Sequence, residues 1–311
     1  IFLKMKKKIL AIQGSSLKEI NIRTDTSFFL GVEAQKRNYD IYYYEPKDLS
    51  FENGNVKAKC RKVKFINDLR KPLKIIKRFN LNLLKSNLLL IRNEPPFNQQ
   101  YINTTFILEH ISKSIKIVND PKSIREVPEK LFSIRLSKYM PPTLISEDLQ
   151  EIKRFFIKYK KVVIKPIDSY SGNDVKLLTS FNQPKIKKLI KRYNHLMFQK
   201  FIPQISKGDK RVFIINNKIK GAISRLPKSG SILSNMSKGA SAKKINLSKQ
   251  EQKISRIVAN ELRKKNIYFA GIDFIKGKLI GDINVTSPTG LKTYFDLTGV
   301  NLAKYFFDNI K

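Results

Sequence analysis

Short apolar runs alternate with helically spaced apolar positions along the first third of the chain. Three runs are typical of buried strands: residues 8–13, 40–44 and 85–92. The apolar spacing between the first two runs predicts a helix over 26–36, with Asp25 or Thr24 as its N-cap. Strands and helices therefore alternate through about residue 120, which is typical of an α/β layer built on a parallel sheet.

The pattern changes in the remainder of the chain, where strands are expected in pairs. Helices are predicted over 129–140, 183–193 and 247–266. The last of these opens with a capping box formed by Ser248 and Glu251. Strands are predicted over 161–166, 211–215, 218–224, 269–275 and 279–285. We therefore expect an N-terminal α/β domain over 1–123 and an α+β domain over 124–311.

The charge of the chain is extreme, with 62 Lys and Arg against 25 Asp and Glu and a formal net charge of +37 in 311 residues. Such a balance allows nucleic-acid binding. The lysines are, however, spread along the chain instead of gathering in a tail or an arm, and the sequence is rich in Ile and Asn, whose codons are A/T-rich like those of Lys. Our hypothesis is that genome bias produced most of the charge, so we expect no specific nucleic-acid partner.

Cysteine and histidine are too few for several classes of site. The single Cys60 excludes a disulfide scaffold and a zinc site built from cysteines, and we expect it to be a tolerated surface thiol. His110 and His195 lie far apart in the sequence, and neither has a catalytic setting. No apolar stretch approaches the length of a membrane span, and the first residues do not resemble a signal peptide. We therefore expect a cytoplasmic protein without a membrane partner.

The predicted hairpin over 269–285 carries the most informative polar residues. Alternate residues of a strand face the same side, so Asp282 and Asn284 point together, and a turn near Gly277 places Asp273 opposite them. Taken alone, such residues form the polar face of an exposed hairpin. The apolar residues around them predict burial instead, and buried carboxylates without a partner are costly. A hard cation that accepts oxygen ligands accounts for the group.

Four basic residues are placed where they could meet phosphate or carboxylate groups. Lys165 ends an apolar strand before a turn, and Lys130 lies at the start of a predicted helix. Arg211 and Arg225 lie at the ends of predicted strands, and a guanidinium group suits carboxylates and phosphoryl groups. Taken singly, each of them is better explained as an ordinary surface cation in a chain with 62 Lys and Arg. The Gly- and Ser-rich segment 228–243 is either floppy or a lid over a site.

These residues fall in motifs that resemble those of bacterial glutathione synthetase, an ATP-grasp ligase, over nearly the whole chain. The matching segments occur in the family's order: Asn21–Ser27, Glu33–Gln35, Ile91–Phe97, Val118–Arg125, Glu129–Phe132, Val163–Asp168, Gly208–Arg211, Ser224–Pro227 and Asp282–Thr289. The resemblance implies an N-terminal pre-ATP-grasp α/β domain with a parallel sheet, followed by an α+β ATP-grasp fold. Its two lobes, over about 124–200 and 201–311, would hold ATP between them.

The resemblance also implies a role for each matching residue. The nucleotide would be contacted by Lys130, Lys165, Asp168, Gly172, Gln199, Phe201, Ile202 and Asp209. Two Mg²⁺ ions would be held by Asp273, Asp282 and Asn284. Arg211 and Arg225 would be catalytic by neutralising an acyl phosphate. The other substrates would be bound by Asn284, Ser287, Thr289 and Gly239.

The implied activity is the ATP-dependent joining of γ-glutamylcysteine and glycine to form glutathione, with ADP and phosphate as the other products. By the same resemblance the protein would form a dimer or tetramer. Two alternatives are a paralogue with another acyl or amine substrate or weakened activity, and a basic polyanion-binding protein on the same scaffold. The chain departs from the family's pattern in carrying Ser169 and Ser171 in place of glycines and Asp282 in place of glutamate.

Overall fold

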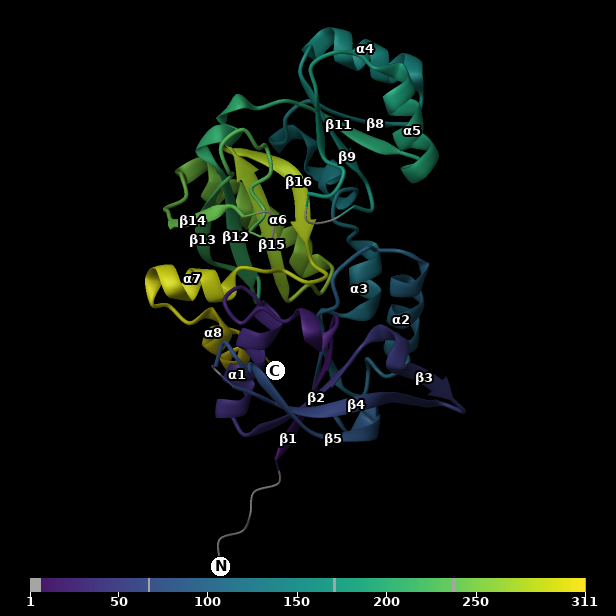
Figure 1. Cartoon of the computed structure of the whole chain (residues 1–311), viewed down its shortest axis with the longest axis vertical. Coiled ribbons are helices and arrows are strands. Elements are labelled where there is room, and N and C mark those ends of the chain that lie inside the picture. The colour runs from purple at the N-terminus through teal and green to yellow at the C-terminus, as the bar shows by residue number, and fades with distance from the viewer. Residues whose placement is uncertain (1–6, 67, 170–171, 237–238, 311) are drawn as a thin grey trace, which may run out of the picture.

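The computed structural model describes residues 7–66, 68–169, 172–236 and 239–310. The described residues form three sheets, which occupy successive positions along the long axis of the molecule (Figure 1). The N-terminal sheet lies at one end. The four-stranded sheet lies at the opposite end, and the five-stranded sheet lies between the two. This is the α/β domain followed by two α+β lobes that the sequence predicts.

The N-terminal sheet has a parallel centre. Its strands are ordered β3-β4-β2-β1-β6-β7, and β5 pairs with β4. The parallel strands are β1 (Lys8–Gln13), β2 (Tyr39–Tyr44), β6 (Leu88–Ile91) and β7 (Lys116–Val118). The helices are α1 (Thr26–Lys36), α2 (Gln99–Glu109) and α3 (Pro121–Glu126), with 3₁₀ turns at Leu17–Glu19, Pro46–Asp48 and Leu83–Lys85. Asp25 caps α1 by accepting a hydrogen bond from the backbone N–H of Phe28, so that predicted cap is confirmed.

An antiparallel addition to this sheet was not predicted from the sequence. It consists of β3 (Leu49–Glu52), β4 (Asn55–Phe65) and β5 (Leu73–Asn82). The lysines on the exposed face of β4 obscure the alternation that buries Val56, Ala58 and Cys60 on its other face. The expectation that Cys60 is a surface thiol was therefore wrong, since the residue is 1% exposed.

The four-stranded sheet forms the lobe that carries α4 and α5. Its order is β10-β9-β11-β8. Its elements are β8 (Thr143–Ser146), α4 (Leu149–Tyr159), β9 (Val162–Pro166), β10 (Lys176–Leu178), α5 (Gln183–Tyr193) and β11 (Leu196–Lys200). The strand and helix predicted over 161–166 and 183–193 are both present. Ile186 and Leu189 bury the apolar stripe of α5 against the sheet, and the lysines of this helix remain outside.

The five-stranded sheet is antiparallel and ordered β14-β13-β12-β15-β16. Its strands are β12 (Asp209–Ile215), β13 (Lys218–Leu226), β14 (Ser241–Lys244), β15 (Phe269–Ile275) and β16 (Lys278–Asn284). The helix α6 (Lys249–Lys264) packs on it and begins with the predicted capping box of Ser248 and Glu251. A 3₁₀ turn at Pro203–Lys207 precedes the sheet.

The helix predicted over 129–140 was wrong in type. The segment forms 3₁₀ turns over Phe132–Tyr139, interrupted at Leu136, whose backbone is not helical. Lys130 consequently lies before the first turn instead of within a helix. The segment approaches β16, since the backbone N–H of Ile283 donates to the carbonyl of Glu129 at 3.2 Å.

The C-terminal helices return to the N-terminal sheet. They are α7 (Leu291–Thr298) and α8 (Leu302–Asp308), and they lie beside α1 (Figure 1). Phe306 and Phe307 share one buried cluster with Leu10 and Phe28. This packing joins the two ends of the chain into one core. Across the described residues, the helices are too short or too polar to cross a membrane.

Candidate functional site

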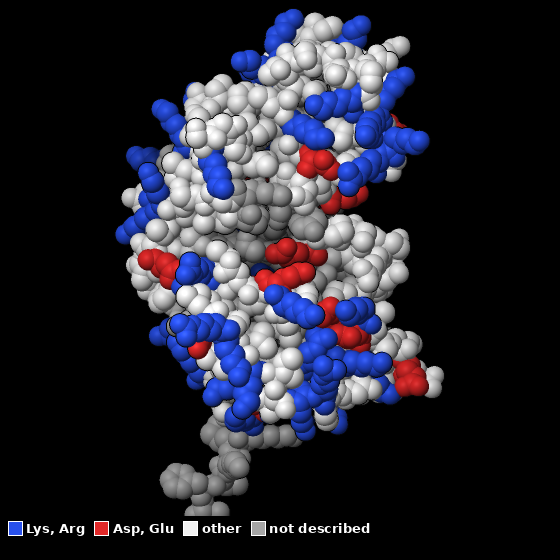
Figure 2. Space-filling view, viewed as in Figure 1, with Lys and Arg blue, Asp and Glu red and all other residues white. Residues whose placement is uncertain are grey.

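A cavity of about 620 Å³ lies where the N-terminal domain and the two lobes meet. Figure 2 shows Lys and Arg side chains spread over both ends of this face, with a hollow between them that has Asp and Glu side chains at its edge. The structure brings most of the predicted site residues to this cavity: Lys130, Lys165, Gly172, Gln199, Phe201, Ile202, Asp209, Arg211, Arg225, Asp273, Asp282, Asn284, Ser287 and Thr289. Asp168 and Gly239 do not line it.

The hairpin of β15 and β16 delivers its three polar residues to the cavity as predicted. Gly271 pairs with Asn284 and Ile272 with Ile283, and the register then shifts before Phe274. This irregularity surrounds Asp273, and the alternation of β16 leaves Asp282 and Asn284 on its less buried face. That Asp273, Asp282 and Asn284 lie close together could be predicted from the sequence, because strand alternation and the position of the turn suffice for it. The register shift at Asp273 could not be predicted, because it reflects a local mismatch between the two strands.

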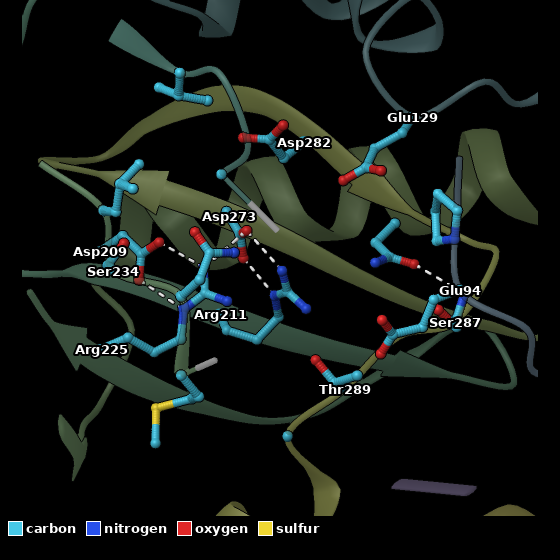
Figure 3. Close-up of a pocket in the computed structure, with 18 of the residues that line it drawn as sticks. Glu94, Glu129, Asp209, Arg211, Arg225, Ser234, Asp273, Asp282, Ser287 and Thr289 are labelled. Carbon is cyan, nitrogen blue, oxygen red and sulfur yellow. Dashed lines mark hydrogen bonds and ion pairs between the residues drawn. The ribbon is translucent and has the colours of Figure 1, made fainter. Parts of the chain in front are cut away.

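Asp273 is buried among charged partners that the sequence argument did not include. Arg211 donates to both of its carboxylate oxygens, and Arg225 lies 2.8 Å from Oδ2 (Figure 3). Burial alone would raise the pKa of Asp273, but the two guanidinium groups lower it to about 2. The inference that this carboxylate lacks a protein partner was therefore wrong, and its burial alone does not require a metal.

Arg225 links the ion pairs around Asp273 to β12 and to segment 228–243. It donates to both carboxylate oxygens of Asp209, and Asp209 in turn interacts with Ser234 (Figure 3). Burial raises the pKa of Asp209, against the opposing effect of Arg225. The result is a buried group with two guanidinium groups and two carboxylates, whose charges balance.

The two predicted phosphate lysines are nearly buried and point to polar groups around the cavity. Lys165 is 8% exposed, and its Nζ donates to the carbonyl of Ile280 at 2.7 Å and to Asp282 at 3.2 Å. Lys130 is 4% exposed and donates to the carbonyls of Ile167 and Ser169. Ser169 is absent from the described residues that have positive φ, so a serine fits the backbone at this position. Ser171 lies outside the described residues.

The segment after β16 holds the predicted substrate residues in a tight turn. Asn284 Oδ1 accepts from the backbone N–H of Ser287 at 3.2 Å. Ser287 and Thr289 both line the cavity, on the side that faces the N-terminal domain. Their hydroxyl groups can donate to or accept from a bound ligand.

Segment 228–243 reaches into the cavity along part of its length. The cavity is lined by residues 232–236, and Leu233 lies against Gly172, which is between β9 and β10. Of the two readings of this segment, floppy connection or lid, its position favours the lid. Positions 237 and 238 lie outside the described residues.

Several cavity residues lie in the matching motif segments, but the sequence reasoning assigned them no role in a site. Most of them belong to the loop between β1 and α1 or to the segment after β6. The set includes Asn21, Asp25, Thr26, Arg92, Glu94 and Glu129. Arg92 is 5% exposed, and burial lowers its pKa. Partial burial raises the pKa of Glu94, and the negative charge of Asp25 adds to this effect. Burial also raises the pKa of Glu129, and the negative charges of Asp282 and Asp273 act in the same direction. The motif Ile91–Phe97 carried this signal, since polar residues directly follow a buried strand there.

The donor set fits a hard divalent cation with phosphate ligands. Among the described residues, no three His, Cys, Asp or Glu side chains could hold a metal ion by themselves. A site around Asp273 and Asp282 therefore needs the amide oxygen of Asn284 and oxygen atoms from a ligand. This is the coordination that Mg²⁺ prefers in nucleotide sites, where phosphates and water complete a small set of carboxylates.

Family models match both parts of the chain. Residues 9–125 match the N-terminal domain of prokaryotic glutathione synthetase, and residues 129–299 match its ATP-grasp domain. The chain is 35% identical to the glutathione synthetase of Bradyrhizobium diazoefficiens, with 97% of each chain covered. It is 34% identical to that of Buchnera aphidicola, with 92% of each covered.

A comparison of folds agrees with these matches. The structure of the ATP-grasp ligase PsnB, complexed with a precursor variant, Mg and ADP, superposes with a TM-score of 0.63 at 12% identity over 97% of each chain. At this identity the likeness concerns the fold alone, and it identifies the two lobes as an ATP-grasp fold. With both family models matched over most of its length, the chain belongs to the prokaryotic glutathione synthetase family.

Proposed function

We propose that this protein joins γ-glutamylcysteine to glycine to form glutathione, with the conversion of ATP to ADP and phosphate. The observation that carries the proposal is the cavity between the three parts of the chain. It combines cations suited to phosphate and carboxylate groups with oxygen donors suited to Mg²⁺. Membership of the glutathione synthetase family supports the same activity.

The chemistry needs positioning and charge neutralisation instead of a protein nucleophile. The cysteinyl carboxylate of the dipeptide attacks the γ-phosphorus of ATP, and ADP leaves. The glycine amine then attacks the resulting acyl phosphate carbon, loses a proton and expels phosphate. Negative charge passes between phosphoryl and acyl oxygens in both steps, so preorganised cations lower both barriers.

Each part of the cavity has a role in this proposal. Lys130 and Lys165 bind the nucleotide phosphates, and residues around Gln199–Ile202 form the adenine pocket. Arg211 and Arg225 neutralise the acyl phosphate, and their pairing with Asp273 and Asp209 holds both guanidinium planes in place. Asp273, Asp282 and Asn284 would hold the magnesium ions, two in number, which would neutralise phosphate charge when bound.

Closure of the cavity protects the reactive intermediate. Water would hydrolyse an acyl phosphate, so the site must exclude it. Residues 232–236 would do this, since they line the cavity next to Asp209 and Gly172. We further propose that the protein works in the cytoplasm, where ATP is available, and that it forms a dimer or tetramer, as the family resemblance implies.

The test is the release of ADP and the formation of glutathione from Mg-ATP, γ-glutamylcysteine and glycine. Each substrate is omitted in turn, and glycine is replaced by a panel of amino acids. Product that depends on all three substrates supports the proposal. Release of ADP with another amine but not with glycine would refute it in favour of a paralogue, and ATP binding without release would favour a binding protein.

A matched pair of variants tests the role of the cavity cations. Lys165→Met removes a buried cation next to Asp282, whereas Lys161→Met removes an exposed lysine four positions earlier on the same segment. We expect the KM for ATP to rise more than about tenfold in the first variant and to stay unchanged in the second. Equal values of KM in both variants would contradict the assignment of Lys165.

A further inference from the structure

The turn that carries Ser287 and Thr289 ends in a helix without a cap of its own. Gly290 occupies the N-cap position of α7, with φ of 110° and no side chain to accept from the first N–H groups. These groups have no partners within the helix, and a capping side chain normally satisfies them. The start of α7 therefore depends on an acceptor from elsewhere in the chain.

Thr26 of the N-terminal domain supplies that acceptor. Its Oγ1 accepts from the backbone N–H of Gly290 at 3.1 Å and from that of Leu291 at 3.4 Å. Thr26 is 1% exposed and begins α1, which is itself capped by Asp25. Because Asp25 caps α1, the hydroxyl of Thr26 is available to cap α7.

Two further side chains of the N-terminal domain hold the same turn at earlier positions. Asn119 donates from Nδ2 to the carbonyl of Val285 at 2.6 Å. Arg92 donates to the carbonyl of Pro288 at 2.9 Å and to the hydroxyl of Ser27 at 3.2 Å. The turn that bears the predicted substrate residues is thus fixed near its start, middle and end by the other domain.

We propose that Thr26 is a positioning residue for the dipeptide substrate. By capping α7, it holds the end of the turn so that Ser287 and Thr289 meet γ-glutamylcysteine in the productive geometry. Without that anchor, the peptide around Gly290 regains freedom, because glycine restricts its own backbone least. Displacement of substrate-binding hydroxyl groups by about 1 Å is enough to weaken binding or rate severely. The inference rests on the proposed function, since it takes the dipeptide as the ligand.

The experiment compares Thr26→Val, which keeps the shape but removes the acceptor, with Thr26→Ser, which keeps the hydroxyl. We expect the KM for γ-glutamylcysteine to rise about tenfold in Thr26→Val while the KM for ATP stays within about twofold. Thr26→Ser restores the dipeptide KM. Amide hydrogen exchange at Gly290 and Leu291 is faster in the valine variant and normal in the serine variant.

Thr104→Val provides the matched control. Thr104 is also buried, at 5% exposure, but its hydroxyl donates to the carbonyl of Tyr101 within α2. This variant loses one buried hydroxyl without touching the turn, so both KM values and the exchange at Gly290 stay as in the wild type.

Two results would overturn the inference. One is an unchanged dipeptide KM in Thr26→Val, and the other is an equal rise in the KM for ATP, which marks a general structural defect. If the wild type does not turn over γ-glutamylcysteine and glycine, the proposed function fails instead. The exchange rates at Gly290 and Leu291 then decide separately whether Thr26 anchors the turn.

Discussion

Replacing Asp273 by asparagine removes one charge from a buried and balanced group. In the wild type, Asp273 and Asp209 oppose Arg211 and Arg225, and all four residues are at most 5% exposed. The variant leaves one positive charge uncompensated in the interior. Breaking a buried ion pair by removing one partner costs about 3–5 kcal/mol, since the remaining charge has lost both its partner and its water.

The low pKa of Asp273 shows in the same direction that the folded protein stabilises the ionised carboxylate. Its lowering from 3.8 to about 2 corresponds to about 2 kcal/mol of stability at neutral pH. Because the folded-state pKa lies below the unfolded one, this stability is fully present above about pH 4 and is lost as the pH falls toward 2. We therefore expect Asp273→Asn to lower the free energy of unfolding by about 2–4 kcal/mol at pH 7.

Urea denaturation followed by circular dichroism measures this difference at several pH values. The gap between wild type and variant should narrow between about pH 4 and pH 2, as the wild-type carboxylate becomes protonated. Glu261→Gln is the control, because Glu261 pairs with Lys264 on the surface of α6 and should change stability by less than about 0.5 kcal/mol. Equal stabilities of Asp273→Asn and Glu261→Gln at pH 7 would refute the reasoning from the buried network.

Three other predictions concern the fold and the site. Cys60 should react with a disulfide reagent at pH 8 only after denaturation, because burial raises its pKa to about 12; rapid reaction of the folded protein would contradict its burial in β4. Phe306→Ala should destabilise the protein by about 3–5 kcal/mol in urea denaturation, since the ring fills the core shared by α8 and the N-terminal sheet, whereas exposed Phe106→Ala should have little effect. Ser169→Gly should leave the KM for ATP within about twofold, because Ser169 has no positive φ to relieve, and a large fall in KM would show that the serine hinders phosphate binding.

Much of the local structure was readable from the sequence because its signals are local. The buried strand over Lys8–Gln13, the helix over Thr26–Lys36 and the capping box at Ser248 depend on residues within a few positions of one another. Asp273, Asp282 and Asn284 could be brought together by the same reasoning, since a hairpin needs only alternation and a turn. The antiparallel strands β4 and β5 could not be predicted in this way, because lysines mask the apolar alternation of β4 and because β5 is exposed along most of its length and has no such alternation.

The partners of the site residues were decided only by the tertiary structure. Asp273 meets Arg211 across neighbouring strands and Arg225 one strand further, and Lys165 meets Asp282 from another sheet. Thr26 caps a helix that begins 265 residues later in the sequence, and α8 completes the core of the first domain. The sequence by itself determined which groups could do the chemistry, because residue type sets charge and hydrogen-bonding capacity. Which of those groups neutralise one another depends on contacts between distant segments, and no local pattern encodes them.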